Sequence, residues 1–233
     1  MLKAHQAQVA SIIPFSWVDG PGNRFVLFLQ GCNFNCLACH NPQTIPLHTP
    51  QAKQMNITEV LVQIQLAMPY ISGITVSGGE ATLQYEFVLE LFMQIKKHRE
   101  LSQLTTFIDS NGNATQGVWD GLAPFTDAVM LDLKAFDNDR HIALTGSSNT
   151  DVLDSIKYLN SINKLYEVRL LLVPGQNDSN DELISTLAWL KGVNPTMKIT
   201  INAFKTHGVR AQARQWPEVS ESDLMRYRSI INN

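Results

Sequence analysis

Residues 31–42 read GCNFNCLACHNP, and this stretch holds all three cysteines of the chain, Cys32, Cys36 and Cys39. Because three and then two residues separate them, one loop can bring the three thiolates to a common centre. Thiolates are soft ligands that suit either zinc or an iron–sulfur cluster. The glycine and asparagines of this stretch favour a loop, which argues against a role for the cysteines as small buried apolar residues.

The number of thiols separates two kinds of metal site. A 4Fe-4S cluster normally takes four cysteine ligands, so a cluster held by three would keep one iron without a protein thiolate. An open coordination position is typical of a catalytic site, whereas a structural site is closed. A structural zinc ion is the alternative, with His40 as the fourth ligand, because His40 directly follows Cys39. The spacing by itself leaves both sites open.

Length and composition limit the class of protein. The chain has 233 residues, a formal net charge of -3 and 44% hydrophobic residues, so we expect a single domain over residues 1–233. The charge gives no reason to propose nucleic acid as a partner. The sequence contains no run of about eighteen apolar residues, so we expect no membrane span. The first ten residues lack the apolar stretch of a secretory signal. Three crowded cysteines make a poor disulfide framework, so we expect a cytoplasmic protein.

Apolar, β-rich runs alternate with helical patterns along the chain. Asn56 followed by Glu59 predicts a capping box at the start of the first helix. Residues 41–54 contain three prolines and are expected to lack regular structure. The alternation predicts parallel βα units, in either an incomplete barrel or a doubly wound sheet. The six expected strands are 24–30, 73–77, 105–109, 128–133, 168–173 and 198–204.

Two polar motifs follow expected strands directly. In SGGE, residues 77–80, paired glycines permit a positive φ and close approach of the backbone to a ligand, although an ordinary turn also explains them. DSNG, residues 109–112, fits a ligand site or a simple turn that caps the next helix. Parallel barrels place their chemistry at the carboxyl ends of the strands, so we expect these motifs to converge.

Charged residues lie within two further strands. Alternation places Met130, Asp132 and Lys134 on one strand face, where two buried charges need a polar ligand or each other. The alternative is that this strand ends near Leu131 and both charges meet water. Arg169, in EVRLLLVPG, fits a carboxylate or partner backbone, or equally a pair with Glu167.

The spacing of Cys32, Cys36 and Cys39 resembles the C-x3-C-x2-C signature of radical S-adenosylmethionine (SAM) enzymes. The flanking VDGPGNRFVLFLQGC and CHNP resemble the glycyl-radical-enzyme activating enzymes, the group that includes the pyruvate formate-lyase activator. The resemblance runs from Val18 to about Gly175. It implies an α/β fold, an incomplete (β/α)6 TIM-like barrel of the radical SAM type. The short proline-rich stretch replaces the cysteine-rich, ferredoxin-like insertion that many activators carry.

The resemblance also implies an activity. One 4Fe-4S cluster on Cys32, Cys36 and Cys39 would bind the methionyl end of SAM at its open iron. An electron from flavodoxin or ferredoxin would cleave SAM, and the resulting radical would remove a hydrogen atom from a glycine of a partner glycyl-radical enzyme. We expect the protein to act as a monomer. Alternatives are a radical SAM enzyme acting on a small molecule, against which the DGPGNRFVLFLQGC match argues, and a non-catalytic zinc-binding module.

Site residues follow from the same resemblance. Asp19 is expected to hold the glycine loop of the partner, although Asp-Gly-Pro-Gly is also an ideal turn. Lys205 stands where the pyruvate formate-lyase activator has a histidine against SAM, with His207 two residues on, and neither is assigned. The implied SAM contacts are Ala38, His40, Gly78, Gly79, Glu80, Ser110, Asn111, Asp132, Leu133, Lys134 and Arg169. A possible monovalent-cation site comprises Asp109, Ser110 in place of a threonine, Met130 and Asp132.

Overall fold

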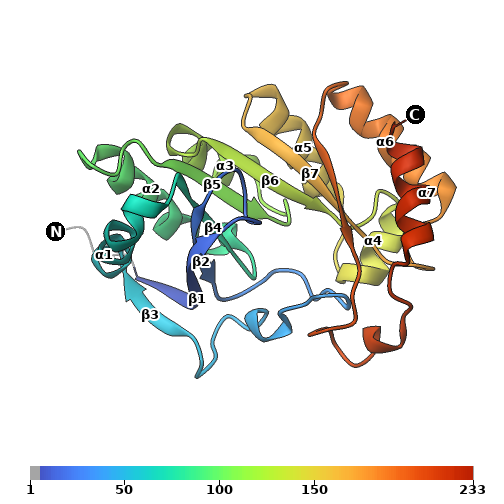
Figure 1. The fold of residues 1–233 in the computed structure, drawn as a ribbon, viewed down its shortest axis with the longest axis horizontal. Coiled ribbons are helices and arrows are strands. Elements are labelled where there is room, and N and C mark those ends of the chain that lie inside the picture. The colour runs from blue at the N-terminus through green and yellow to red at the C-terminus, as the bar shows by residue number, and fades with distance from the viewer. Residues whose placement is uncertain (1–5, 233) are drawn as a thin grey trace.

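Each of the six apolar runs predicted as a strand forms one in the computed structural model, which describes residues 6–232. The six strands pair in parallel, each with the next along the chain (Figure 1). Residues 1–5 and 233, which the single-domain prediction includes, lie outside the described residues. The parallel strands are β2 (Arg24–Leu29), β4 (Gly73–Gly78), β5 (Thr105–Ser110), β6 (Ala128–Leu133), β7 (Leu165–Leu172) and β8 (Ile199–Ala203).

The order of the strands distinguishes a barrel from a doubly wound sheet. The sheet runs β3-β1-β2-β4-β5-β6-β7-β8, so its parallel part follows the chain without reversing direction. Since βαβ crossovers are nearly always right-handed, such an order places every crossover helix on the same face. A doubly wound sheet instead reverses its order and carries helices on both faces. The order therefore agrees with the expected incomplete barrel.

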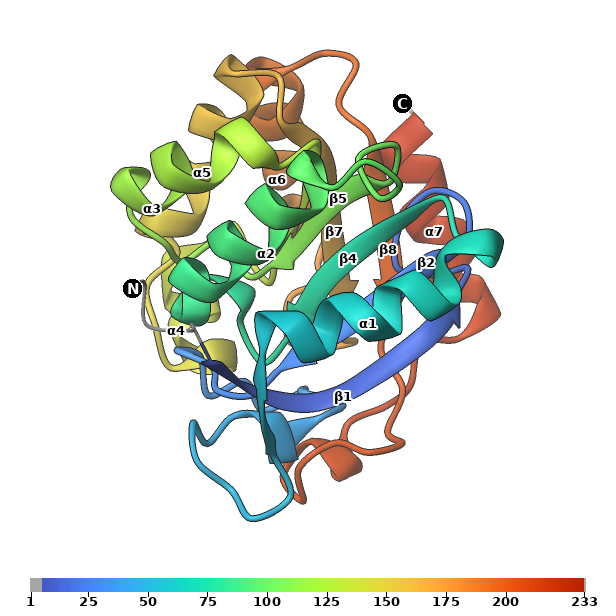
Figure 2. The ribbon, with the colours of Figure 1, turned by 90° about the vertical axis from the view of Figure 1, so that its left-hand side faces the viewer.

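Helices cover the outer face of this sheet. Figure 2 shows α1, α2, α3 and α5 on that face, with the strands behind them. The predicted capping box is confirmed, because the Glu59 amide donates to Asn56 Oδ1 at 3.0 Å and the Asn56 amide to Glu59 Oε2 at 2.7 Å. The α-helices are α1 (Ile57–Ala67), α2 (Tyr85–Lys97), α3 (Gln116–Leu122), α4 (Asn138–Thr145), α5 (Thr150–Ser161), α6 (Asn180–Val193) and α7 (Glu221–Asn232).

Two antiparallel strands extend the sheet beyond the predicted six. Strand β1 (Gln6–Ser16) pairs with β2, and β3 (Lys53–Asn56) pairs with β1. The prediction that residues 41–54 lack regular structure is wrong at both ends, because Pro42–Thr44 form a 3-10 turn and Lys53 begins β3. Strand β3 can form because all three prolines lie before it and because the free edge of β1 supplies hydrogen bonds to β3. Within residues 6–232, no helix has the length and apolar character needed to cross a bilayer.

Candidate active site

All three cysteines line one cavity of about 390 Å³ at the carboxyl ends of the parallel strands. Gly78 and Gly79 reach it from the end of β4, Asp109 and Ser110 from β5, and Asp132 from β6. The expected convergence of the motifs is therefore confirmed. Of the predicted SAM contacts, the cavity is lined by Ala38, His40, Gly78, Gly79, Ser110, Asn111, Asp132 and Lys134.

The cysteine loop is held by neighbours from both sides. The amide of Cys32 donates to the Ile45 carbonyl at 3.0 Å, and the amide of Asn35 donates to the Thr145 carbonyl at 2.8 Å. Phe34 is buried and meets the ring of His141 edge-on, with ring centres 5.4 Å apart. The loop is thus anchored to the proline-rich stretch and to the end of α4.

Two N–H groups point at the sulfur of Cys32. The amide of Phe34 lies 3.4 Å from Sγ, and Asn111 Nδ2 lies 3.7 Å from it. Burial raises the pKa of the Cys32 thiol to about 12, which the Phe34 amide opposes, and burial also raises the pKa of Cys36. Because metal ligation requires thiolates, loading a metal centre here would release protons.

The zinc alternative requires His40 as a fourth ligand. Its ring nitrogen Nε2 lies 3.0 Å from the carbonyl oxygen of Lys205, which makes this nitrogen the donor of a hydrogen bond. Within residues 6–232, no group of three or more His, Cys, Asp or Glu side chains is spaced to hold a single metal ion.

The residues present fit an iron–sulfur cluster with one open position. Three thiols share one cavity, one of them accepts N–H donors, and the full sequence contains no fourth cysteine to close the site. Hydrogen bonds to sulfur are among the features that tune such clusters. Polar groups from three strand ends line the rest of the cavity, which suits a polar ligand next to the cluster.

The glycines of the SGGE turn allow close approach between segments of the chain itself. Gly78 has a φ of +128°, and a Cβ there would lie 2.1 Å from the Leu29 carbonyl oxygen. A Cβ at Gly79 would lie 2.2 Å from the carbonyl oxygen of Gly31. The amide of Glu80 donates to that same carbonyl at 2.8 Å. The turn is therefore packed directly against β2 and the cysteine loop.

Glu80 does not present its carboxylate to the cavity. The side chain is buried, and its two oxygens accept hydrogen bonds from the amides of Thr82 and Asn111 at 2.9 and 2.7 Å. The Ser110 hydroxyl donates a further bond at 2.8 Å. Burial raises the pKa of Glu80, against these hydrogen bonds. In this structure the Glu80 side chain joins the SGGE turn to the DSNG turn, and the contact between Glu80 and SAM stays a prediction.

Asp132 and Lys134 form an ion pair at the edge of the cavity, with 2.7 Å between Oδ2 and Nζ. Strand β6 continues to Leu133, so the alternative that it ends near Leu131 is wrong. Burial alone would lower the pKa of Lys134, but Asp132 and Cys36 raise it above its ordinary value. Leu133 is buried in the core, so a contact between its side chain and SAM is not supported.

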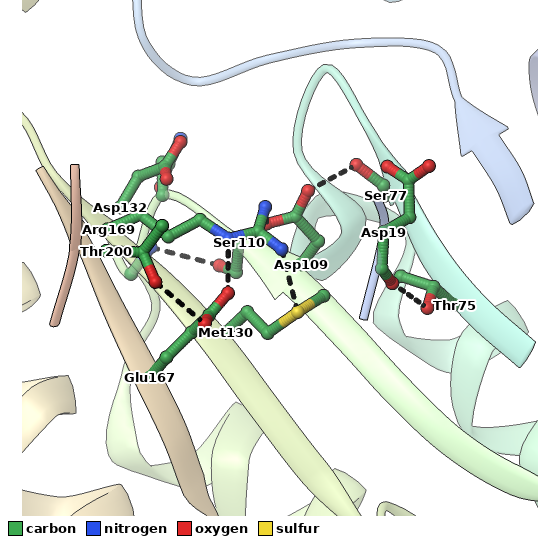
Figure 3. A network of polar contacts seen from close by, with 12 residues as sticks. Asp19, Thr75, Ser77, Asp109, Ser110, Met130, Asp132, Glu167, Arg169 and Thr200 are labelled. Carbon is green, nitrogen blue, oxygen red and sulfur yellow. Dashed lines mark hydrogen bonds and ion pairs between the residues drawn. The ribbon is translucent and has the colours of Figure 1, made fainter. Parts of the chain in front are cut away.

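Arg169 forms the predicted pair with Glu167 and also pairs with a carboxylate of the chain itself, that of Asp109 (Figure 3). Its guanidinium pairs with Glu167 at 2.7 Å and with Asp109 at 3.1 Å, and Nη2 lies 2.8 Å from the sulfur of Met130. Burial raises the pKa of Asp109 to about 6, although Arg169 opposes this shift. Arg169 is not among the cavity-lining residues, so its predicted SAM contact is not supported by this arrangement. Its charge lies against two residues of the predicted cation site.

Asp19 lies in the expected turn, in which Gly20 and Gly22 have φ values of +128° and +73°. The hydroxyl of Ser16 donates to its carboxylate, and the hydroxyl of Thr75 donates to its carbonyl at 2.6 Å. Thr75 and its partner Arg24 were missed in the sequence, although a charged residue opening the apolar run RFVLFL was a usable signal.

The last strand contributes unpredicted residues to the cavity. Asn202 and Ala203 line it from the end of β8, where their position at the end of an expected strand was the available signal. Lys205 pairs with Glu218 at 3.1 Å. Neither Lys205 nor His207 is among the cavity-lining residues.

Comparisons with known proteins agree with this site. A family model described as the radical SAM superfamily matches residues 26–188. Pyruvate formate-lyase-activating enzymes of Staphylococcus aureus, such as those of strains USA300 and COL, are 36% identical over 215 residues, covering 90% of this chain and 84% of each relative.

Solved structures share the fold. A domain of a pyruvate-formate lyase-activating enzyme from Bacteroides vulgatus ATCC 8482 has a TM-score of 0.59 at 18% identity, covering 69% of this chain and 93% of that chain. Streptococcus suis SuiB bound to S-adenosylmethionine has a TM-score of 0.66 at 16% identity, covering 87% of this chain and 45% of that chain. With the family match across most of its length, the chain belongs to the radical SAM superfamily.

Proposed function

We propose that this chain is an activating enzyme that cleaves SAM reductively and removes a hydrogen atom from a glycine of a partner glycyl-radical enzyme. The observation that carries the proposal is the cavity in which all three cysteines of the chain meet the polar ends of parallel strands. The similarity to the Staphylococcus aureus activating enzymes over 90% of this chain supports the choice of partner class.

In this mechanism the cysteines and the neighbouring N–H groups would hold the iron–sulfur cluster. When bound, a 4Fe-4S cluster supplies the electron for SAM cleavage and an iron without a protein thiolate. Cys32, Cys36 and Cys39 would hold it, and Asn111 and the Phe34 amide would stabilise the Cys32 thiolate by hydrogen bonding. The buried Glu80 carboxylate accepts a hydrogen bond from the Asn111 amide and so keeps Asn111 in place.

The ion pair of Asp132 and Lys134 would orient SAM. Lys134 has three N–H donors and uses one on Asp132, so the others are available for a carboxylate. Asp132 can accept hydrogen bonds from ribose hydroxyls. Asp109 lines the cavity next to this position and is held by its ion pair with Arg169. Binding both ends of the ligand would hold its reacting bond in one place while the cavity walls limit access of water.

Several further features belong to the same proposal. We infer that residues 1–233 act as a single radical SAM domain and a monomer in the cytoplasm, with flavodoxin or ferredoxin as the electron donor. Asp19 would hold the backbone of the partner's glycine segment. A monovalent cation at Asp109, Ser110, Met130 and Asp132 also stays a proposal, with the Arg169 charge as its competitor.

Anaerobic reconstitution with iron and sulfide tests the function. The reconstituted protein should cleave SAM under dithionite and should produce an EPR-detectable glycyl radical on pyruvate formate-lyase. Cys36→Ala should abolish SAM cleavage and reduce iron and sulfide content, because it removes one of three cluster ligands. Full cleavage by this variant, or a colourless protein with stoichiometric zinc, would rule out the proposed cluster. Cleavage coupled to a modified small molecule, with no protein radical, would favour the small-molecule alternative.

A further inference from the structure

Arg24 is a fully buried cation whose hydrogen bonds all go to uncharged oxygens. Nε donates to the Thr75 hydroxyl at 2.6 Å, Nη2 to the Ile74 carbonyl at 2.6 Å, and Nη1 to the Pro21 carbonyl at 3.2 Å. The guanidinium also lies 4.2 Å from the ring centre of Phe107. Within residues 6–232, no carboxylate forms an ion pair with it.

Burying this charge costs free energy of folding, so we asked what the guanidinium does that a neutral side chain could not. Burying a charge without a counter-charge is unfavourable, and here burial lowers the pKa of Arg24 to about 10. Hydrogen bonds from a charged donor are, however, about twice as strong as neutral ones. Arg24 therefore holds its backbone and hydroxyl acceptors more firmly than a neutral amide or hydroxyl would.

The acceptors of Arg24 lead to the turn that carries Asp19. The Thr75 hydroxyl donates to the Asp19 carbonyl at 2.6 Å (Figure 3). The same hydroxyl accepts a hydrogen bond from Arg24, so it connects the two residues. Arg24 also holds the Pro21 carbonyl directly. A Cβ at Gly20 would lie 2.7 Å from Arg24 Cδ, so the turn rests on the arginine side chain.

The neighbouring strands leave room for this side chain. A Cβ at Gly73 would lie 2.6 Å from Arg24 Nη1 and 2.2 Å from the Thr105 hydroxyl, so only glycine accommodates the guanidinium at the start of β4. Arg24, Gly73 and Thr105 are all at the amino ends of their strands. The cysteine cavity lies at the opposite ends, roughly 15–20 Å away for strands of six residues.

We propose that Arg24 is a positioning residue that, through Thr75, fixes the turn of residues 19–22 so that Asp19 is preorganised to bind the glycine segment of the partner enzyme. The inference rests on the proposed function. The adjacent Trp17 and Val18 are 76% and 83% exposed, so their packing contributes little to holding the turn. Without the anchor, ordering the turn would cost free energy when the partner binds. SAM cleavage without a partner would not involve this cost.

Thr75→Val tests the connection, because valine keeps the shape and removes the hydroxyl. Thr106→Val is the matched control. Thr106 is equally buried on the next strand, but its hydroxyl donates to the Phe125 carbonyl at 2.7 Å, away from the turn. Both variants are reconstituted anaerobically. SAM cleavage is measured without partner, and glycyl-radical formation is measured against pyruvate formate-lyase concentration.

We expect Thr75→Val to raise the KM for pyruvate formate-lyase roughly tenfold, the size of one hydrogen bond to a charged group, with partner-free SAM cleavage within about twofold of wild type. Thr75→Ser should restore the KM, and Thr106→Val should leave it unchanged. Equal loss of cleavage and activation in Thr75→Val, or an equal rise in KM in Thr106→Val, would overturn the proposal.

A second measurement does not depend on activity. Hydrogen exchange of the peptide covering residues 17–23 should be faster in Thr75→Val than in wild type, and unchanged in Thr106→Val. Unchanged exchange in Thr75→Val would overturn the positioning role even if no radical forms on pyruvate formate-lyase. Absence of the radical in the wild-type protein, with the expected exchange result, would instead overturn the proposed function and leave Arg24 as the anchor of the turn.

Discussion

At the scale of single residues, the site depends on buried polar side chains outside the cavity as well as on those that line it. Glu80 is the clearest case, because its carboxylate joins the turns after β4 and β5 without facing a ligand. Each of its oxygens accepts a backbone N–H, which cannot reverse its direction as a hydroxyl can. The charge and geometry of this side chain are therefore specified by the backbone around it.

Glu80→Gln should lower the free energy of unfolding by about 1–3 kcal/mol, because the new amide group must face either the Thr82 or the Asn111 N–H and leave it unsatisfied. Denaturant unfolding measures this loss. Glu86→Gln is the control, since Glu86 is exposed in the first turn of α2, and its effect should stay within about 0.5 kcal/mol. Equal effects of the two substitutions would show that the hydrogen bonds of Glu80 to the two turns do not stabilise the fold.

At the scale of elements, local signals and long-range pairing contribute differently. Helix α1 begins where its capping box predicts, because both halves of the box lie within four residues. Strand β3 has no comparable local signal. Its four residues are mostly polar, and its hydrogen bonds come from β1, more than forty residues earlier (Met55 pairs with Ala7).

Asn56→Ala should destabilise the protein by about 1 kcal/mol, the typical loss for an N-cap hydrogen bond. Thr115→Ala offers a matched comparison, because Thr115 occupies the N-cap of α3 without a side-chain hydrogen bond to the helix. We expect its effect to be clearly smaller. Thermal unfolding of both variants decides the point, and a loss in Thr115→Ala as large as that in Asn56→Ala would show that the capping box contributes nothing specific.

At the scale of the whole molecule, the site exists because segments far apart in sequence meet at one end of the barrel. The SGGE turn packs against the cysteine loop so closely that Gly79 has no room for a methyl group. This contact sets the distance between the thiols and the polar strand ends. The packing is between backbones, which cannot move aside as a flexible side chain can.

Gly79→Ala should therefore destabilise the fold by about 1–3 kcal/mol or more and reduce iron loading on reconstitution, because Cβ would displace the Gly31 carbonyl. Gly117→Ala is the control. Nothing lies within 4 Å of a Cβ at that helical position, so alanine should be neutral or stabilise the protein by up to about 1 kcal/mol. Iron content and unfolding midpoint are measured for both. Normal iron loading in Gly79→Ala would contradict the packing argument.

Much of the fold and part of the site were predictable from local patterns. The six parallel strands, the capping box and the grouping of the three thiols each depend on residues within a few positions of one another, where periodicity and spacing carry the information. The convergence of the SGGE and DSNG motifs followed from the rule that parallel strands end at the same edge.

The roles of individual polar residues were decided only by the tertiary structure. Arg24 and Thr75 are 51 residues apart, and Arg169 and Asp109 are 60 apart. The burial of Glu80 depends on a turn 31 residues later. A side chain next to a motif can face the ligand, or it can support the loop that faces the ligand. The local sequence is the same in the two cases. Only the packing of the distant strands determines which of the two it does.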